Sequence, residues 1–432
     1  MLGAFVSAFR TPDLRRKLLF VMFIIILFRL GSAIPTPGVD YVKVQEGIES
    51  VGDQGIFGLI NLFSGGALLQ LSIFALGIMP YITASIILQL LVVVIPRLET
   101  LKKEGQAGQS KITQYTRYLT LGLAILQSTG IVALARNGAI FGNSGGGESL
   151  LVNDNLTTMI LMIITMTAGT AMIMWFGELI TERGIGNGMS ILIFTSVVSS
   201  FPGALWGIKQ AKGWDVFGLV IAIGLVIMAA VIFIEQAQRR IPVQYARRMV
   251  GRKMFGGTST YIPLKVNQAG VIPVIFASSL LYLPSLTSQF NTSNTGWSAW
   301  VQTHFQNGDH PYYMITYVAL IIFFTYFYVS ITFNPTEVAD NMKKYGGFVP
   351  GIRAGKPTED YLAYVLSRIT FPGAIYLALV ALVPLIALVV VNANQNFPFG
   401  GTSLLIMVGV GLDTVKQIES QLQQRHYEGF LR

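Results

Sequence analysis

Apolar stretches of about 20 residues recur along the whole chain, and this recurrence restricts the fold more than any other feature. A helix of that length spans the roughly 30 Å hydrocarbon core of a bilayer. The sequence therefore predicts an all-α integral membrane protein with ten transmembrane helices. The predicted spans lie approximately at 18–35, 71–95, 117–136, 156–177, 188–206, 215–234, 269–290, 312–333, 369–391 and 401–418.

The composition agrees with a membrane bundle. Of the 432 residues, 52% are hydrophobic and only 12% are charged, against about 25% charged in ordinary soluble domains. The basic segment 1–17 and the apolar run after it imitate a signal peptide, but many further apolar segments follow, so we interpret 18–35 as a first transmembrane helix. The chain has no Cys, so we expect neither disulfides nor thiolate metal sites.

Lys and Arg alternate between the two sides of the predicted membrane. Most of the 30 lie on one side; Lys43, Arg136, Lys209 and Lys212 lie on the other, and Arg29 lies inside the first span. By the positive-inside rule, the rich side and both termini are predicted to be cytoplasmic. The basic segments on that side are 1–17, 96–117, 178–187, 235–268, 334–368 and 413–432.

Two of the predicted cytoplasmic loops, 235–268 and 334–368, stand out by length and charge. One interpretation is that they touch anionic lipid. The other is that they form a docking surface for a large partner, since about 35 residues rich in Gly, Pro and aromatic side chains exceed what lipid contact requires. The basic residues concerned are Arg239, Arg240, Arg247, Arg248, Arg252 and Lys253 in the first loop, with Arg353 in the second.

On the outer side, the segment at about 57–69 is too short to span a membrane and too apolar for a free loop. It is predicted to be either a re-entrant segment buried in the bundle or a helix lying on the outer interface.

Two short segments occur twice, at matching places in two sets of five spans. Gly77–Ser85 and Gly270–Ser278 are identical at five of nine positions, and Gly188–Ile193 and Gly401–Ile406 at four of six. An odd number of spans in each half makes the halves insert in opposite directions, which is typical of an inverted repeat. We predict an N-terminal half, 1–210, and a C-terminal half, 211–432. Their working site is expected at the midplane between them.

The repeated segments carry bulky apolar side chains at helical spacing. If their faces converge, they form a ring that excludes water and ions from a pore. Lipid contact or ordinary core packing is the alternative for any single apolar face. The ring residues would be Ile82, Ile86, Met189, Ile193, Ile275 and Ile406.

Charge and catalytic groups are scarce inside the predicted spans. Ion-coupled transporters usually need buried Asp, Glu or His, and only Arg29 lies well inside a span; it either snorkels to the outer interface or pairs with the buried outer segment. The three His residues fall in loops or the tail, and no metal or nucleotide motif is complete. We expect no catalytic site, metal, cofactor or nucleic-acid substrate.

Along nearly its full length, the chain resembles the SecY family, whose members are the central subunits of the bacterial Sec translocon. The resemblance rests on long stretches in order: PTPGVD (35–40), LFSGGALLQLSIFALGIMPYITASIILQLL (62–91), KKEGQ (102–106), QYTRYLTL (114–121), GELITERGIGNGMS (177–190), PLKVNQAGVIPVIFASS (263–279), FNPTEVADNMKKYGGFVPGIRAG (333–355) and FGGTSLLI (399–406).

The resemblance implies roles for particular residues. It assigns the pore ring to the six residues named above, with Met189 a flexible departure from the usual branched aliphatic residue. It implies a plug at about 57–69 and a lateral gate between spans 2–3 and 7–8, with Gln127 and Asn267 as polar contacts. It also assigns Arg353 and the basic residues of 235–268 to docking. The plug residues are Phe63, Ser64, Gly65, Gly66 and Leu68.

The implied function is a protein-conducting channel of the bacterial cytoplasmic membrane, which translocates unfolded polypeptides bearing signal sequences and releases apolar segments sideways into lipid. The implied partners are SecE and SecG in a heterotrimer, the SecA ATPase, the ribosome and membrane lipids. A secondary transporter built on inverted repeats is the alternative from another class.

Overall fold

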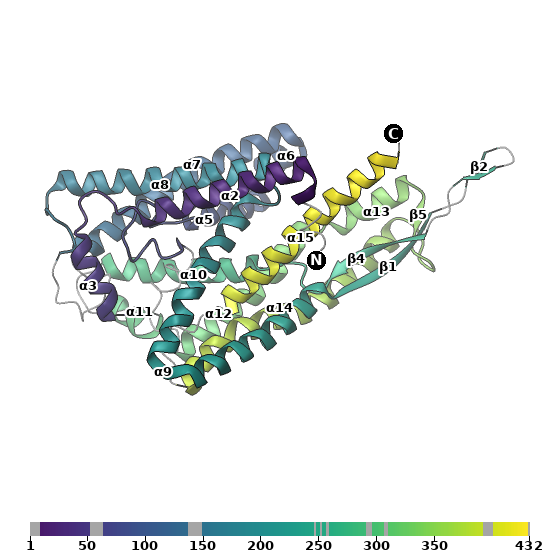
Figure 1. The fold of residues 1–432 in the computed structure, drawn as a ribbon. Coiled ribbons are helices and arrows are strands. Elements are labelled where there is room, and N and C mark those ends of the chain that lie inside the picture. Colours follow the sequence, from purple (N-terminus) through teal and green to yellow (C-terminus); the bar gives the residue numbers. More distant parts are fainter. Residues whose placement is uncertain are drawn as a thin grey trace.

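The structure is a computed structural model that describes residues 9–51, 64–136, 149–245, 248–250, 253–255, 259–290, 296–305, 310–391 and 401–430. These residues form a bundle of long helices with a small β-sheet beyond one end of it (Figure 1). The helices are α2 (Pro12–Ala33), α3 (Tyr41–Val51), α5 (Met79–Val94), α6 (Pro96–Lys103), α7 (Gln106–Arg136), α8 (Leu156–Arg183), α9 (Gly188–Gln236), α10 (Ile272–Phe290), α11 (Trp297–Phe305), α12 (Pro311–Thr332), α13 (Pro335–Lys344), α14 (Lys356–Val391) and α15 (Gly401–Phe430).

Each of the ten predicted spans coincides with a helix, but the fifth and sixth share α9. Gly213 interrupts this helix with φ 84°, a left-handed conformation that glycine adopts without steric cost. Two helices therefore meet at a kink. The break lies close to the predicted boundary between the halves, and that division stays a prediction.

Several spans are shorter or more bent than the sequence suggests. Among the described residues, five helices are long and apolar enough to cross a membrane by themselves, or six if α5 and α6 form one broken span bent by 100°. Pro96 begins α6 at that bend, because proline cannot donate the hydrogen bond that would continue the preceding helix. Gly188–Gly203 and Ile272–Leu281 are apolar helices of less than full spanning length.

The second predicted span, 71–95, is only partly helical. Its helix begins at Met79, and residues 65–78 form consecutive turns, apart from a single bridge residue at Ser72. Leu71 has φ 45° and is completely buried. The expected helix for 71–78 is therefore wrong: the apolar character there comes from burial inside the bundle, and apolar runs do not distinguish buried turns from helix.

The predicted repeat has the same backbone in both halves. Gly77 and Gly270 have φ 56° and 62°, and each lies two residues before a helix, α5 or α10. Pro80 and Pro273 stand near the start of those helices, where the missing proline N–H costs no hydrogen bond. The sequence identity at these positions thus encodes one helix-start geometry used twice.

The chain before each repeated helix is hydrogen bonded to the end of an earlier one. The backbone N–H of Ile73 donates to the carbonyl of Ile34, which follows α2, at 2.9 Å. The N–H of Val266 donates to the carbonyl of Ala237, which follows α9, at 3.0 Å. Ile73 and Val266 each lie four residues before the repeated glycine. In each half, this hydrogen bond joins the two ends of an intervening segment, 34–73 in the first half and 237–266 in the second. We call each of these segments an excursion.

In each half, a glycine packs against the carbonyl group of the residue that donates this hydrogen bond. A Cβ on Gly169 of α8 would lie 2.1 Å from the carbonyl oxygen of Ile73, and a Cβ on Gly373 of α14 would lie 2.4 Å from that of Val266. Real Cβ atoms do not approach backbone so closely. We call the bond and the glycine contact together the base clamp; it occurs once per half.

The described residues of the second excursion form β-strands, whereas those of the first form α3, turns and isolated bridges. Strand β1 (Gln238–Tyr245) pairs antiparallel with β4 (Ser259–Lys265) and with β5 (Gly347–Phe348), while β2 (Arg248–Val250) pairs with β3 (Lys253–Phe255). The loops 235–268 and 334–368 therefore share one sheet and one apolar core, formed mainly by Ile241, Val243, Leu264, Met342, Val349, Leu362 and Val365.

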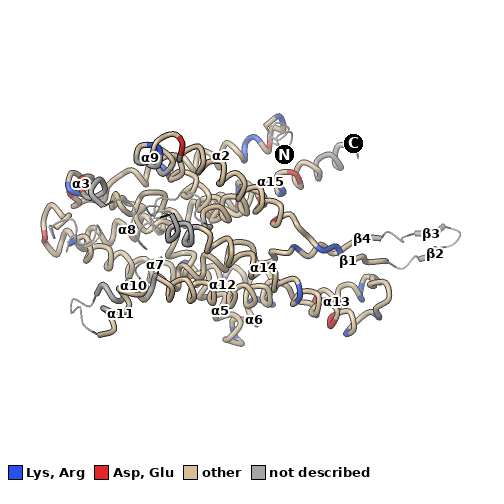
Figure 2. The backbone as a smooth tube through the Cα atoms, turned by 90° about the horizontal axis from the view of Figure 1, so that it is seen from below, with Lys and Arg blue, Asp and Glu red and all other residues tan. Residues whose placement is uncertain are grey.

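Charges lie mostly towards the ends of the bundle, and its middle is almost free of them (Figure 2). Long exposed apolar faces cover the helices; Phe233, Val226 and Ile164 are 78%, 69% and 60% exposed. Surfaces of this kind are stable against lipid rather than water, as the spans predict.

Candidate functional site

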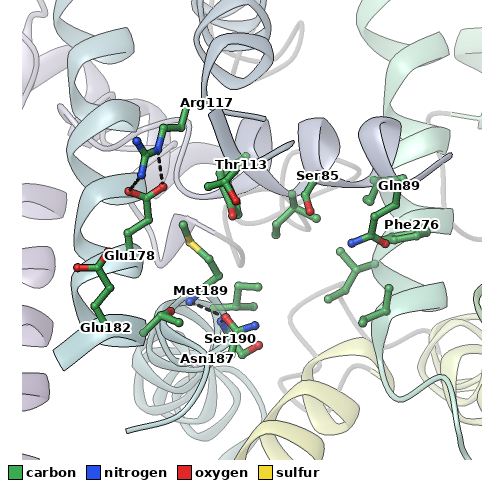
Figure 3. A pocket seen from close by; sticks show the side chains of 17 residues that line it. Ser85, Gln89, Thr113, Arg117, Glu178, Glu182, Asn187, Met189, Ser190 and Phe276 are labelled. Carbon is green, nitrogen blue, oxygen red and sulfur yellow. Dashed lines mark hydrogen bonds and ion pairs between the residues drawn. The ribbon is translucent and has the colours of Figure 1, made fainter. Parts of the chain in front are cut away.

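A cavity of about 400 Å³ lies between α5, α7, α8, α9 and α10 (Figure 3). The starts of α5, α9 and α10 are all repeated segments, so the cavity forms where the two predicted halves meet. This is the position at which inverted-repeat membrane proteins place their working sites.

Five of the six predicted ring residues line this cavity: Ile82 and Ile86 from α5, Met189 and Ile193 from α9, and Ile275 from α10. The structure thus brings together side chains that are almost 200 residues apart in sequence. Their burial agrees with close packing, since Ile86, Ile193 and Ile275 are each at most 8% exposed. Their role as a seal stays a prediction.

The sixth predicted ring residue, Ile406 of α15, does not line the cavity. It is 1% exposed and packs in the same apolar cluster as Ile193 and Ile275. Ile406 therefore belongs to the apolar packing that includes ring side chains, and its role in the ring stays a prediction.

Met189 is held in place by an unusually close approach of two helices. A Cβ on Gly188 would lie 1.9 Å from the carbonyl oxygen of Gly177 on α8, and a Cβ on Gly177 would lie 2.3 Å from the Met189 sulfur. The side chain of Asn187 caps α9 by accepting from the N–H of Met189 at 3.0 Å and of Ser190 at 3.4 Å. The glycines of this segment thus serve packing and helix capping.

Apart from Ile272 and Phe276, the rest of the cavity wall is polar. Arg117 of α7 donates two hydrogen bonds to Glu178 of α8, each 2.8 Å long, and Glu182 lies on the same side (Figure 3). Polar walls keep a cavity hydrated, whereas a band of apolar side chains disfavours water. The remaining polar lining consists of Tyr81, Ser85, Gln89, Thr113, Thr181, Asn187 and Ser190.

The described part of the predicted plug is buried. Ser64 and Leu68 are at most 1% exposed, and the Ser64 hydroxyl accepts from the N–H of Leu68 at 3.0 Å. Gly65 and Gly66 have φ 67° and 90° and form the turn between them. This part of the segment lies within the bundle and not on its surface; Phe63 and the rest of 57–63 lie outside the described residues.

Arg29 contacts this buried segment. Its Nη1 donates to the carbonyl of Gly65 at 2.8 Å and to the hydroxyl of Ser199 on α9 at 3.0 Å. Of the two interpretations left open by the sequence, pairing with the buried outer segment is the one the structure favours.

The two predicted gate residues are both buried, Gln127 to 5% and Asn267 to 2% exposure. The Nδ2 of Asn267 donates to the carboxylate of Glu235 at 2.5 Å and to the carbonyl of Gly270 at 3.2 Å. These partners are on the same side of the predicted gate as Asn267, so Asn267 is bonded within its own half.

The two sides of the predicted gate touch through apolar side chains. Ile86 of α5 packs with Phe276 of α10 and Phe324 of α12, and the two phenyl rings meet edge to face with centroids 5.6 Å apart. A second cavity, of about 390 Å³, opens between α5, α6, α7 and α12 beside this contact, where Gln89 and Tyr328 are among its lining residues.

The predicted docking residues lie on the sheet and near its edge. Arg239 and Arg240 on β1 are exposed, as is Arg353 in the turn after β5. Arg248 lies in β2 and Lys253 in β3, whereas Arg247 and Arg252 lie outside the described residues. Docking by this surface stays a prediction.

Glu235 is the polar residue that sequence reasoning missed. We placed it at the beginning of a cytoplasmic loop, but α9 continues to Gln236 and Glu235 is only 7% exposed. In the structure, Val231 and Glu235 are both buried and lie one helical turn apart, so the buried face of α9 continues to the end of the helix.

Within the described residues, no group of three or more His, Cys, Asp or Glu side chains is placed to hold a metal ion. The arrangement described above is a cavity lined by apolar and polar side chains, beside an aliphatic and aromatic contact between α5 and α10.

Comparisons with known proteins agree with this geometry. Residues 72–415 match the model of the SecY family. Two relatives are named protein translocase subunit SecY: that of Streptomyces galbus is 68% identical, and that of Mycobacterium bovis is 59% identical, each over 100% of both chains. These relatives support a translocation channel and not a secondary transporter.

Solved structures show the same fold at low sequence identity. A protein-conducting channel superposes with a TM-score of 0.63 at 18% identity, covering 93% of this chain and 91% of the other. Sec61 from a canine ribosome-channel complex gives 0.59 at 18% identity, with 94% and 91% covered. Together with the apolar helices, these findings make the chain a multi-pass membrane protein, and the matches over most or all of its length show that it belongs to the SecY family.

Proposed function

We propose that this chain forms a channel in the bacterial cytoplasmic membrane through which unfolded, signal-bearing polypeptides cross. The observation that carries the proposal is the cavity between the repeated segments, lined by Ile82, Ile86, Met189, Ile193 and Ile275. Identity of 68% to a protein translocase subunit over the full length supports the same function.

The apolar side chains act as a seal without a chemical preference. Water and ions are disfavoured at an apolar constriction, while an extended polypeptide passes because aliphatic side chains adapt to many shapes. The buried segment containing Ser64–Leu68 packs against α9, because a Cβ on Gly65 would lie 3.2 Å from the Cα of Ser196, three residues beyond Ile193. In our proposal this segment is the plug.

Sideways release follows from the contact between α5 and α10. Parting Ile86 from Phe276 exposes a passing chain to lipid, where each centre-placed Leu favours insertion by about 0.3–0.6 kcal/mol. Over roughly twenty apolar residues these contributions separate membrane spans from secreted chain without any recognition code.

The exposed Arg239, Arg240 and Arg353 form a basic surface on a sheet that is braced by its own core. We propose that the SecA motor or the ribosome docks there, on the cytoplasmic side with both termini. SecE and SecG would complete a heterotrimer, with SecE bracing the halves 1–210 and 211–432.

Photocrosslinking from position 82 tests the proposal. The chain is reconstituted in vesicles with SecE, and a precursor with a folded block is stalled midway by SecA. A photoreactive residue replaces Ile82, and in the matched control it replaces Ile164, which is 60% exposed on α8. We expect crosslinks to the stalled precursor from position 82 and none from position 164.

Two results would contradict the proposal in different ways. Equal crosslinking from both positions, with translocation intact, would show that the polypeptide does not pass the ring. Absence of translocation in the complete system would refute the channel itself.

A further inference from the structure

The carboxylate of Glu235 is buried at the end of α9 and directed to one partner. It is 7% exposed, and Asn267, which donates to it at 2.5 Å, is 2% exposed. A buried polar group is costly unless it is hydrogen bonded, and removing the partner of a buried acceptor costs its full desolvation. The Glu235–Asn267 pair is therefore a strong local restraint.

Asn267 transmits this restraint to the start of α10. The same Nδ2 that donates to Glu235 also donates to the carbonyl of Gly270 at 3.2 Å. Gly270 is the repeated glycine with φ 62°, and α10 begins two residues later. One amide thus ties the end of α9 to the turn that aims α10, the helix carrying Ile275 and Phe276.

Three charged residues act electrostatically on Glu235: Lys265, Asp413 and Lys416. Lys265 of β4 and Asp413 of α15 form an exposed ion pair of 3.3 Å. The Oδ1 of Asn267 and the hydroxyl of Tyr376 on α14 have no hydrogen-bond partner among the described residues. This polar cluster is therefore only partly hydrogen bonded in the arrangement seen here.

We propose that Glu235 is a positioning residue for the gate: through Asn267 it holds the start of α10 in the arrangement seen here and so opposes opening without a signal sequence. The inference rests on the proposed channel function. It deepens that function by naming a group that fixes the start of α10, the helix whose Phe276 packs against Ile86 of α5.

The test compares passage of two precursors into vesicles, one with an intact signal sequence and one with a polar sequence in its place. The variants are Glu235→Ala, Asn267→Ala, both together, and Glu235→Gln, whose amide oxygen still accepts from Asn267. Asp413→Asn is the matched control, because it removes a neighbouring carboxylate that does not contact Asn267. Thermal unfolding of each variant is measured alongside.

We expect Glu235→Ala and Asn267→Ala each to increase passage of the signal-deficient precursor several-fold, with no further increase in the double variant, because residues in one chain of contacts are not additive. Glu235→Gln and Asp413→Asn should remain near the wild type. If Glu235→Ala acted only by loosening the fold in general, Glu235→Gln would not restore the low passage of the signal-deficient precursor.

Unchanged passage in Glu235→Ala, or single effects that multiply in the double variant, would overturn the inference. If Glu235→Ala fails to assemble, Glu235→Met keeps the side-chain volume without the acceptor and is compared with Glu235→Gln in the same way. Failure of the wild-type chain to pass even the intact precursor would instead refute the proposed function.

Discussion

The starts of α5 and α10 have the same backbone but are held by different chemistry. In the first half, Phe74 follows the base clamp, stacks on Phe28 at 5.9 Å between centroids and fills the space beside Gly31. In the second half, the equivalent residue is Asn267, bonded to Glu235. Apolar packing fixes the start of α5, and a hydrogen bond fixes the start of α10.

This difference bears on which side of the proposed gate moves. Apolar packing at Phe74 is specific in shape, so repositioning α5 loses contact area outright. Asn267 is held by hydrogen bonds instead, and its Oδ1 has no partner among the described residues. We therefore expect α10 to be the adjustable side, and four predictions sharpen or break this comparison.

The largest effect is expected for Phe74→Ala. Removing a buried phenyl ring costs about 3–5 kcal/mol of unfolding free energy, whereas Asn267→Ala costs about 1–3 kcal/mol, because it leaves the Glu235 carboxylate unpaired. Thermal or denaturant unfolding in detergent measures both. Phe323→Ala, at a side chain 60% exposed on α12, is the control; equal losses at Phe74 and Asn267 would remove the contrast.

The base clamp should behave alike in both halves. Gly169→Ala and Gly373→Ala each place a Cβ against a backbone carbonyl, and overpacking of this kind costs about 1–3 kcal/mol. Gly122→Ala on α7 meets nothing within 4 Å and should be neutral or stabilising by about 0.5–1 kcal/mol. A large loss at only one of the two clamp glycines would argue against a shared clamp.

Arg29 restrains the buried segment in the first half only. Because the chain contains no Cys, Ala67→Cys provides a single thiol at a fully buried position. Arg29→Met removes the bonds to Gly65 and Ser199, so the thiol should react several-fold faster with a water-soluble maleimide. When Glu235→Ala is made in the Ala67→Cys chain with Arg29 intact, the rate of the thiol reaction should be unchanged, since Glu235 lies in the other predicted half.

The smallest effects belong to two exposed ion pairs, one in each half. Arg136–Asp154 and Lys265–Asp413 both measure 3.3 Å, and exposed pairs contribute about 0–1 kcal/mol. Asp154→Asn and Asp413→Asn should therefore lower the unfolding free energy slightly and equally, and less at high salt. A loss well above 1 kcal/mol at either site would mean that the pair is part of a larger network.

Hydrophobic length and residue identity predicted the helical bundle and the repeated segments. They did not predict the turns before Met79, because apolar residues buried in turns look the same as those in a helix. The strands of 238–265 were also missed, although the buried Ile241 and Val243 alternate with exposed neighbours, which is the period of a strand.

The candidate site was predictable to the extent that it repeats. Ile82 and Ile275 were found because the sequences around them match. Ile406 was assigned to the same ring, and in the structure it lies in the apolar cluster and not in the cavity lining. Glu235 was missed because a charge at the end of an apolar run is normally a solvated one. Its burial depends on Asn267, which comes from a distant part of the chain and has no local signature.

The base clamp gives both excursions the same junction with the bundle. A backbone hydrogen bond joins Ile34 to Ile73 in the first half and Ala237 to Val266 in the second. The chain between the bonded residues differs, since the first excursion contains α3 and the buried Ser64–Leu68, whereas the second contains β-strands. One junction thus accommodates two unrelated insertions, while the turn that starts the following helix keeps the same backbone.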